Sequence, residues 1–285
     1  MGLSKIGLDQ WSRYIKLKTW IFEDTCSTIN CNNLLLLLDD IFPKKFQAKK
    51  LGFENNHIPI GFHFLYNNQP NTSLGTDGYD NYQAPMVKDE QAYKRRMWVK
   101  GNIEIYKSPL LNQYLKCTEK VHTVKTFGDA TFVNINREFS DTKCLNFIEN
   151  RTLIYKNDLY QLVANHASFP KFNDALNIKL SYNDIIRYSH LTYNCHKIHY
   201  DSNYCREIEN LPEIIVQGPF MVTLLLYWFQ KLHPDFTIGK FTYKNIEPWF
   251  LHDTVTFGIV EGEDSYKLQI INEKKGKVYM EGTIR

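Results

Sequence analysis

A ten-residue segment, TYNCHKIHYD at residues 192–201, gathers side chains that could transfer protons. It contains the amide of Asn194, the imidazoles of His196 and His199, and the carboxylate of Asp201. Histidine has an ordinary pKa near neutral pH, which suits a general base. An amide can orient a hydroxyl or a water molecule but cannot take its proton. The segment therefore indicates proton-transfer chemistry with an imidazole as the base.

Gly218 and Pro219 follow this segment and begin a long apolar run. Proline is favoured in the first turn of a helix, so the run predicts a helix over about 218–232. The free N–H groups at the start of such a helix can hold an oxyanion. A proton-transfer group facing an oxyanion pocket suits chemistry next to a carbonyl. We therefore take His199, Asn194 and Gly218 as the candidate catalytic residues.

Each candidate also has a purely structural interpretation. His199 could be a hydrogen-bonded core histidine, and Asn194 a turn residue with a left-handed backbone. Asp201 could be a helix N-cap, and His196 could line a pocket without reacting. For Gly218, a role as a helix cap and a role in an oxyanion pocket are compatible.

A zinc site is another chemistry that this region could support, with ligands Cys195, His196, His199 and Cys205. None of their spacings is a CxxC or HxxxH pair, which are typical of zinc ligands. We therefore expect no metal.

The composition is that of an ordinary globular protein, with 285 residues, 43% of them hydrophobic and 23% charged. The net charge of +3 is too small for a dedicated nucleic-acid binder. Six scattered cysteines favour a reduced, intracellular protein. We expect no membrane-spanning segment. The basic and aromatic N-terminus fits either an amphipathic helix or a weak mitochondrial presequence.

Short helices and strands must position the candidate residues. Helices are predicted at the N-terminus, from Asn32 or Asn33 through Asp40, over 182–191, from Asp201 or Ser202 through Glu209, and over 218–232. Strands are predicted near 97–106, 114–125, 130–138, 144–156, 236–246, 254–261, 265–272 and 277–284. The polar stretch 67–94 has no sustained apolar period, which is typical of a functional lid or a partly disordered connection.

The helix at 218–232 is apolar on nearly every face, so protein must surround it. An antiparallel meander long enough to curl around it follows, as in a hotdog domain. Helices followed by strands occur twice, which predicts an α+β double hotdog with two antiparallel sheets, each wrapping a central helix. We expect an N-terminal unit at residues 1–155 and a C-terminal, catalytic unit at 156–285.

Several motifs, in this order, resemble the MaoC-like dehydratases of the double-hotdog group. The likeness is to the fungal 3-hydroxyacyl-thioester dehydratases type 2 of mitochondrial fatty-acid synthesis and to mesaconyl-thioester hydratases. It covers about residues 59–240. The matching segments are PIGFHFLY (59–66), LGTDGY (74–79), RRMW (95–98), and Asn194, His196, Ile198, His199, Tyr200, Asp201, Tyr204, Pro212, Gly218 and Pro219.

The chain departs from the subgroup pattern at two positions, and from the pattern of the wider family at a third. Lys197 stands where the subgroup prefers Arg, and Gln217 where a His precedes Gly-Pro. Asn194 stands where the wider hydratase family has a catalytic Asp, so only His199 matches that family's Asp and His pair.

The resemblance implies removal of water from (3R)-3-hydroxyacyl thioesters to give trans-2-enoyl thioesters, without a cofactor. It implies acyl carrier protein or coenzyme A thioesters as substrates, a mitochondrial matrix location, and a monomer or homodimer. The N-terminal unit would bind the acyl tail. We expect Arg95 and Arg96 to contact the phosphate of a pantetheine arm or an acidic carrier, unless they form a solvated edge. The further expected substrate-binding residues are Tyr193, His196, Asp201 and Trp98.

Two other functions remain open from the sequence. A hotdog thioesterase would need a carboxylate or an activated water aimed at the carbonyl, and Asn194 supplies neither. A non-catalytic acyl-thioester-binding module would need no base at all. Hydration of an enoyl thioester distinguishes both from a dehydratase.

Overall fold

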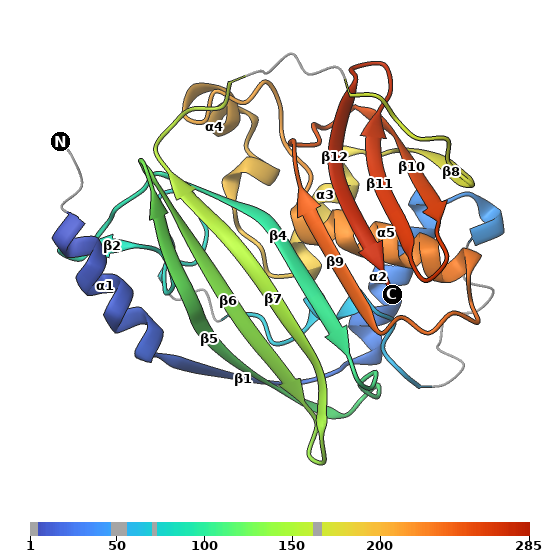
Figure 1. The fold of residues 1–285 in the computed structure, drawn as a ribbon, viewed down its shortest axis with the longest axis horizontal. Coiled ribbons are helices and arrows are strands. Elements are labelled where there is room, and N and C mark those ends of the chain that lie inside the picture. Colours follow the sequence, from blue (N-terminus) through green and yellow to red (C-terminus); the bar gives the residue numbers. More distant parts are fainter. Residues whose placement is uncertain (1–4, 47–55, 70–72, 162–166) are drawn as a thin grey trace.

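In the computed structural model, residues 5–46, 56–69, 73–161 and 167–285 are described. Ten strands of the described chain form one antiparallel sheet in the order β1-β5-β6-β7-β4-β9-β12-β11-β10-β8 (Figure 1). These strands are β1 (Thr19–Thr25), β4 (Arg95–Ile105), β5 (Tyr114–Phe127), β6 (Ala130–Ser140), β7 (Leu145–Lys156), β8 (Asp174–Lys179), β9 (Lys240–Asn245), β10 (Thr254–Glu261), β11 (Tyr266–Asn272) and β12 (Lys277–Ile284).

The sheet consists of two five-stranded halves, and the double-hotdog prediction is confirmed. Strands β4 and β9 pair over Lys100↔Lys244 to Glu104↔Lys240. The two expected sheets therefore meet edge to edge and form one continuous sheet. Two edge strands were not predicted, β1 and β8, because their polar residues hide the strand pattern. They extend the sheet at its two outer edges.

Helix α5 (Gly218–Leu232) is the central helix of the C-terminal half, as predicted. Its residues from Phe220 to Phe229 are all buried. In Figure 1 it lies behind the C-terminal strands, which curve around it. An apolar helix of this kind is stable only when protein covers every side.

Helix α2 (Thr28–Ile41) belongs to the N-terminal half but lies beside α5 (Figure 1). Phe42, just after α2, packs on Tyr227 of α5, with ring centroids 5.2 Å apart. The helix starts earlier than predicted because Ser27 is its N-cap and accepts a hydrogen bond from the Ile29 N–H. The two halves thus share one core.

Helix α1 (Lys5–Leu17) lies beside the N-terminal strands, on the side away from α5 (Figure 1). The prediction of an amphipathic helix is confirmed. Leu8, Trp11 and Ile15 on its apolar face are buried in a second core cluster with Val121 and Val133. Within the described residues, helices are too short or too polar to cross a membrane.

The stretch 67–94, expected to be a lid or partly disordered, is folded onto the body of the protein wherever it is described. It contains turns and a small hairpin of β2 (Met86–Val87) and β3 (Glu90–Gln91). Asp77, Gln83 and Tyr93 of this stretch are buried. Residues 70–72 lie outside the described chain.

Three short elements surround the candidate residues. Helix α3 (Tyr182–Leu191) starts at a capping box made by Ser181 and Asp184. The 3-10 turn η3 (Lys197–His199) and helix α4 (Ser202–Glu207) follow it. On the N-terminal side, the 3-10 turn η2 (Phe62–Leu65) packs close to α2.

Candidate active site

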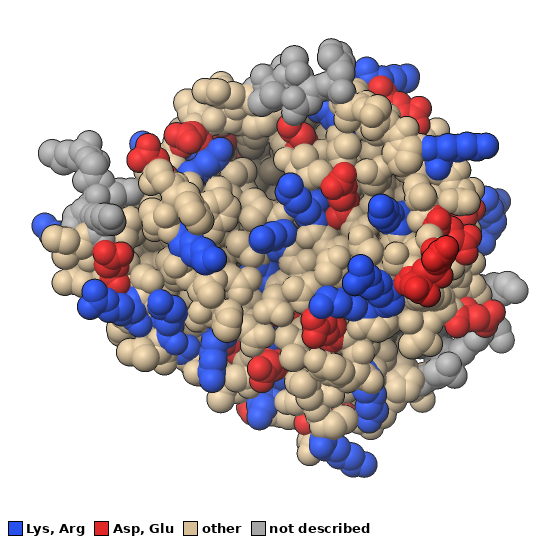
Figure 2. All heavy atoms as spheres, in the orientation of Figure 1, with Lys and Arg blue, Asp and Glu red and all other residues tan. Residues whose placement is uncertain are grey.

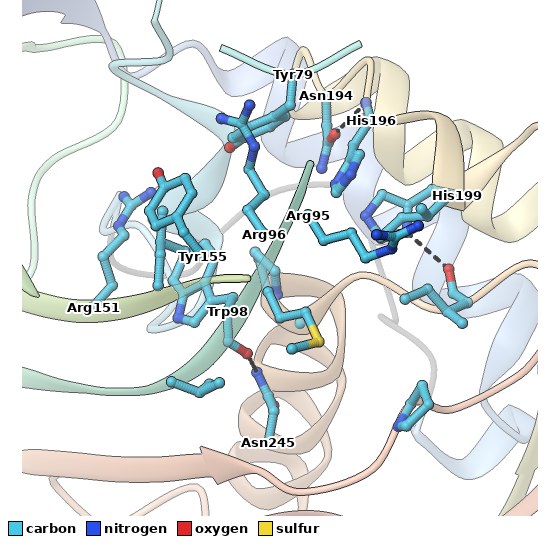
Figure 3. Close-up of a pocket in the computed structure, with 18 of the residues that line it drawn as sticks. Tyr79, Arg95, Arg96, Trp98, Arg151, Tyr155, Asn194, His196, His199 and Asn245 are labelled. Carbon is cyan, nitrogen blue, oxygen red and sulfur yellow. Dashed lines mark hydrogen bonds between the residues drawn. The ribbon is translucent and has the colours of Figure 1, made fainter. Parts of the chain in front are cut away.

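A cavity of about 270 Å³ lies where the two halves of the molecule meet. The N-terminal strands β4, β6 and β7, the turn before η3 and the start of α5 all contribute to its wall (Figure 3). The residues that line it include Tyr79, Asp80, Arg95, Arg96, Trp98, Ile135, Arg151, Leu153, Tyr155, Asn194, His196, His199, Glu209, Gly218, Pro219 and Met221. The structure therefore brings His199, Asn194 and Gly218 to one cavity.

His199 has the hydrogen bonding and the charge state of a general base. Its Nδ1 lies 2.8 Å from the carbonyl oxygen of Ile215 (Figure 3). A carbonyl only accepts, so Nδ1 carries the proton and Nε2 carries the lone pair. Burial lowers the pKa of His199 from 6.5 to about 4. At neutral pH the ring is uncharged and able to take a proton.

Asn194 presents an amide N–H group to the cavity. Its Oδ1 accepts a hydrogen bond from the His196 backbone N–H at 3.0 Å, so its Nδ2 is the end left to meet a ligand (Figure 3). The residue before it, Tyr193, has a left-handed backbone with φ of 54°. This turn, just after α3, directs Asn194 inward.

Gly218 is the first residue of α5 and lies in the cavity wall. A Cβ atom there would come within 2.8 Å of Nδ2 of Asn245, which donates to the Trp98 carbonyl at 2.7 Å. Only glycine fits this position without displacing Asn245. The N–H groups of the first helical turn have no partner within the helix, as an oxyanion pocket requires.

Gln217, which stands where the subgroup has His, connects α5 to α3. Its Nε2 donates to the Ile185 carbonyl at 2.9 Å and to the Ser189 hydroxyl at 2.8 Å. Gln217 is fully buried. Its departure from the family pattern is therefore accommodated by hydrogen bonds that fix the start of α5.

His196 lines the cavity beside His199, with ring centroids 5.4 Å apart and ring planes at 85°. Its Nε2 lies 3.5 Å from Oδ2 of Asp77. Burial, the neighbouring His199 and the positive charge of Arg96 hold the pKa of His196 well below its ordinary value. Like His199, it is neutral at physiological pH.

The two arginines expected to hold a phosphate use their donors inside the protein. Arg96 is buried and donates from Nε and Nη2 to both carboxylate oxygens of Asp77, at 2.7 and 3.2 Å. Arg95 forms an ion pair with Glu209 at 2.6 Å. It also donates to the carbonyls of Asn157 and Ile208. Their side chains shape the cavity wall, and these bonds compete with any phosphate.

Two expected substrate-binding residues do not reach the cavity. Tyr193 is 55% exposed, because its left-handed backbone turns the side chain away from Asn194. Asp201 is the N-cap of α4, and its Oδ1 accepts the Tyr204 N–H at 2.9 Å. The helix-cap interpretation of Asp201 is the one that the structure supports. Trp98 does line the cavity.

The set of residues considered for zinc is dispersed. Cys195 is exposed, whereas Cys205 is buried with its Sγ 3.4 Å from the Ile198 carbonyl. Burial raises the pKa of the Cys205 thiol to about 12, which disfavours the thiolate that a metal needs. Among the residues that the structure describes, no group of three or more His, Cys, Asp and Glu could hold a metal ion.

Sequence reasoning assigned no role to several polar residues in or next to the cavity wall, among them Asp77 and Arg151. Asp77 was visible as part of the LGTDGY motif but was not assigned a role. Arg151 carries its guanidinium 4.5 Å above the Trp98 ring and donates from Nη2 to Glu149 at 2.9 Å. Its position in a predicted strand gave no signal that it would face a cavity.

The fold and the cavity define a class: a double-hotdog protein with a neutral, buried histidine beside a helix N-terminus. The MaoC-like dehydratase from Phytophthora capsici shares this fold, with a TM-score of 0.72 at 13% identity over 96% of each chain. The family model of hydroxyacyl-thioester dehydratase type 2 matches residues 61–251. The chain belongs to this family, and the predicted resemblance is confirmed.

Two curated relatives agree with this assignment. The mitochondrial hydroxyacyl-thioester dehydratase type 2 of Saccharomyces cerevisiae is 28% identical over 288 residues, covering 95% of this chain and 99% of the relative. The mesaconyl-C(4)-CoA hydratase of Chloroflexus aurantiacus is 24% identical and covers 68% of this chain and 71% of the relative. The prediction of a dehydratase that acts on acyl thioesters is confirmed at the level of the family.

Proposed function

We propose that this protein removes water from (3R)-3-hydroxyacyl thioesters to give trans-2-enoyl thioesters in mitochondrial type II fatty-acid synthesis. The observation that carries the proposal is the convergence of His199, Asn194 and Gly218 on one cavity. Neutral His199 is the base, and the start of α5 provides N–H donors for the thioester carbonyl.

The reaction begins at the carbon next to the thioester carbonyl. The Gly218 N–H donates a hydrogen bond to the carbonyl oxygen and stabilises the negative charge that develops there. Nε2 of His199 takes the α-proton, because its lone pair is free while Nδ1 donates to Ile215. His199 is then a cation, and the substrate is an enolate-like intermediate.

The second step breaks the bond between the β-carbon and the hydroxyl. The electron pair of the enolate forms the new carbon–carbon double bond, and the hydroxyl leaves with the C–O pair. His199 returns its proton to the leaving hydroxyl, so water departs and the imidazole is neutral again. Asn194 Nδ2 donates to the hydroxyl oxygen and keeps it within reach of His199. One histidine thus performs both proton transfers.

The two halves would divide the substrate between them. We assign residues 156–285 to the catalytic unit and residues 1–155 to the unit that receives the acyl tail. Ile135 and Leu153, from N-terminal strands β6 and β7, give that part of the cavity apolar surface. Arg151, paired with Glu149, forms a polar part of the same wall.

The donor of the acyl group would be acyl carrier protein, with coenzyme A thioesters as surrogates. A single chain already contains both halves, which supports a monomer. The name of the Saccharomyces cerevisiae relative places that protein in mitochondria, and this supports a mitochondrial matrix location for the present chain. Basic and acidic side chains are interspersed on the face seen in Figure 2.

Hydration of a trans-2-enoyl thioester, the reverse reaction, tests the proposal. We expect wild-type protein to be active and His199→Ala to lose activity by about 10²–10⁴, the range for removal of a general base. The matched control is His190→Ala, whose side chain is exposed at the end of α3. Wild-type activity in His199→Ala would remove the assigned base. Release of free thiol without hydration would instead identify a thioesterase.

A further inference from the structure

Three buried groups from both halves of the chain form a connected unit at the edge of the cavity. Asp77 is 2% exposed and is held by Arg96 through the two hydrogen bonds described above. The same oxygen that accepts the bond from Arg96 Nε lies 3.5 Å from Nε2 of His196. Asp77 thus stands between a permanent cation and an imidazole that lines the cavity.

The backbone locks this arrangement. Gly78 has φ of +82°, and a Cβ atom there would collide with the Cys195 carbonyl oxygen. The Asp77 carbonyl accepts the Lys197 N–H at 2.9 Å, and the Thr76 carbonyl accepts Nζ of Lys197 at 2.8 Å. The turn at 74–80 therefore packs directly on the turn that carries Asn194 and His196, and the direction of the Asp77 carboxylate is fixed.

We propose that Asp77 is a positioning residue that keeps the proton of His196 on Nε2, so that Nδ1 accepts a hydrogen bond from the β-hydroxyl of the substrate. An ionised carboxylate can only accept hydrogen bonds, so the ring nitrogen that faces it must carry the proton. A neutral imidazole has one N–H, and its other nitrogen is then an acceptor. This inference rests on the proposed function.

The surroundings of His196 agree with this role. Its side chain is almost fully buried, yet it belongs to the cavity wall. Within the described part of the chain, Nδ1 has no hydrogen-bond partner, which leaves it available to a ligand. A histidine that only connected Asp77 to the fold would not need an open nitrogen at the cavity.

As a consequence, two hydrogen bonds orient the hydroxyl that leaves. The substrate hydroxyl donates its hydrogen to His196 Nδ1 and accepts a hydrogen bond from Asn194 Nδ2. Its remaining lone pair faces His199, which delivers the proton when the C–O bond breaks. His196 neither gains nor loses a proton during the reaction. Its contribution is the orientation of the hydroxyl.

The tautomer can be measured in the wild-type protein. Imidazole ¹⁵N chemical shifts separate a protonated from an unprotonated ring nitrogen, and loss of signals in His196→Gln assigns them to His196. We expect protonated Nε2 and unprotonated Nδ1. A proton on Nδ1 in the wild-type protein would overturn the proposal without the need for any variant.

Asp77→Asn is the matching variant, because an amide can donate to Nε2 and move the proton to Nδ1. We expect kcat to fall roughly 10- to 100-fold, the cost of one misplaced hydrogen bond. The inhibition constant of a saturated acyl thioester, which has no hydroxyl, should stay unchanged. The control is Asp89→Asn, on an exposed, left-handed position of the same segment that asparagine tolerates.

Further outcomes separate this inference from a structural role and from the proposed function. If Asp77 acts through His196, Asp77→Asn should add little to the loss in His196→Gln. Additive losses, or an unchanged tautomer with unchanged kcat, would overturn the inference alone. A fully active His199→Ala would instead overturn the proposed function, whatever the tautomer of His196.

Discussion

At the scale of single residues, burial rather than an ion pair sets the chemistry of the site. His199 has no carboxylate partner in the described residues, and its pKa falls to about 4 because protein replaces water around it. A base with so low a pKa is a weak proton acceptor in water. In the mechanism that we propose, it works because the Gly218 N–H polarises the thioester and makes the α-proton more acidic.

The same burial predicts a pH dependence of stability. The pKa values of His63 and His199 are lowered from 6.5 to about 4. The unfolded chain therefore binds protons between these values that the folded chain does not. The contribution of these histidines to the free energy of unfolding is fully present above about pH 6.5 and is lost as the pH drops toward 4. If the whole pKa shift is realised, each histidine lowers the free energy of unfolding at acidic pH by on the order of 3 kcal/mol.

Urea unfolding at pH 7 and pH 5 measures this effect. Asp80, whose pKa burial raises to about 6, acts in the opposite direction and offsets part of it. The pKa of a third histidine, His196, is lowered as well, so we expect a lower unfolding free energy at pH 5 despite the raised pKa values of Asp80 and Glu209. Equal or greater stability at pH 5 would contradict the neutral, buried state of these rings.

The sequence singled out residues that the structure brings to one cavity, but not the buried groups that pack beside them. His199 and Gly218 could be found because each is marked in the sequence itself, His199 by a short motif and Gly218 by the apolar run that it begins. Asp77 could not be assigned, because its role depends on packing against His196, more than one hundred residues away. Arg96 was expected to contact a phosphate, since a sequence does not show that Asp77 already occupies its donors.

At the scale of elements, the turn at 74–80 is the part that differs most from expectation. The stretch lacks an apolar period, so sequence patterns indicate a loop. The structure shows instead that Gly78 allows close contact between this turn and the Cys195 carbonyl. Long regular elements such as α5 and β10 were predicted closely, because their apolar periods are continuous. Edge strands β1 and β8 were missed because polar residues interrupt their apolar pattern.

Gly78→Ala tests the importance of this contact. The added methyl group would collide with the Cys195 carbonyl, and φ of +82° is unfavourable for alanine. We expect a loss of about 1–3 kcal/mol in stability, together with reduced kcat because Asp77 is displaced. Thermal unfolding and the hydration assay measure both effects.

Gly239→Ala is the control for this experiment. A Cβ atom there would lie 3.6 Å from the Arg285 carbonyl, which is an ordinary contact. We expect its stability to change by no more than about 0.5 kcal/mol, as for a surface substitution. Similar behaviour of the two variants would mean that the turn at 74–80 can move without affecting the site.

At the scale of the whole molecule, the cavity depends on both halves at once. One core cluster contains Leu115 and Phe139 from N-terminal strands as well as Leu225 and Phe257 from the C-terminal half. The pairing of β4 with β9 makes the sheet continuous across the boundary. His199 and Gly218 in the cavity wall come from one half, whereas Arg151 and Trp98 come from the other. The halves therefore form a single site.

A crystal structure with an unreactive 3-hydroxyacyl analogue, such as an amide in place of the thioester, tests the central claim most directly. We predict the analogue's carbonyl oxygen at about 2.7–3.1 Å from the Gly218 nitrogen. Its α-carbon should lie about 3–3.5 Å from Nε2 of His199, and its hydroxyl beside Asn194. A carbonyl turned away from the start of α5, or an α-carbon out of reach of His199, would contradict the account.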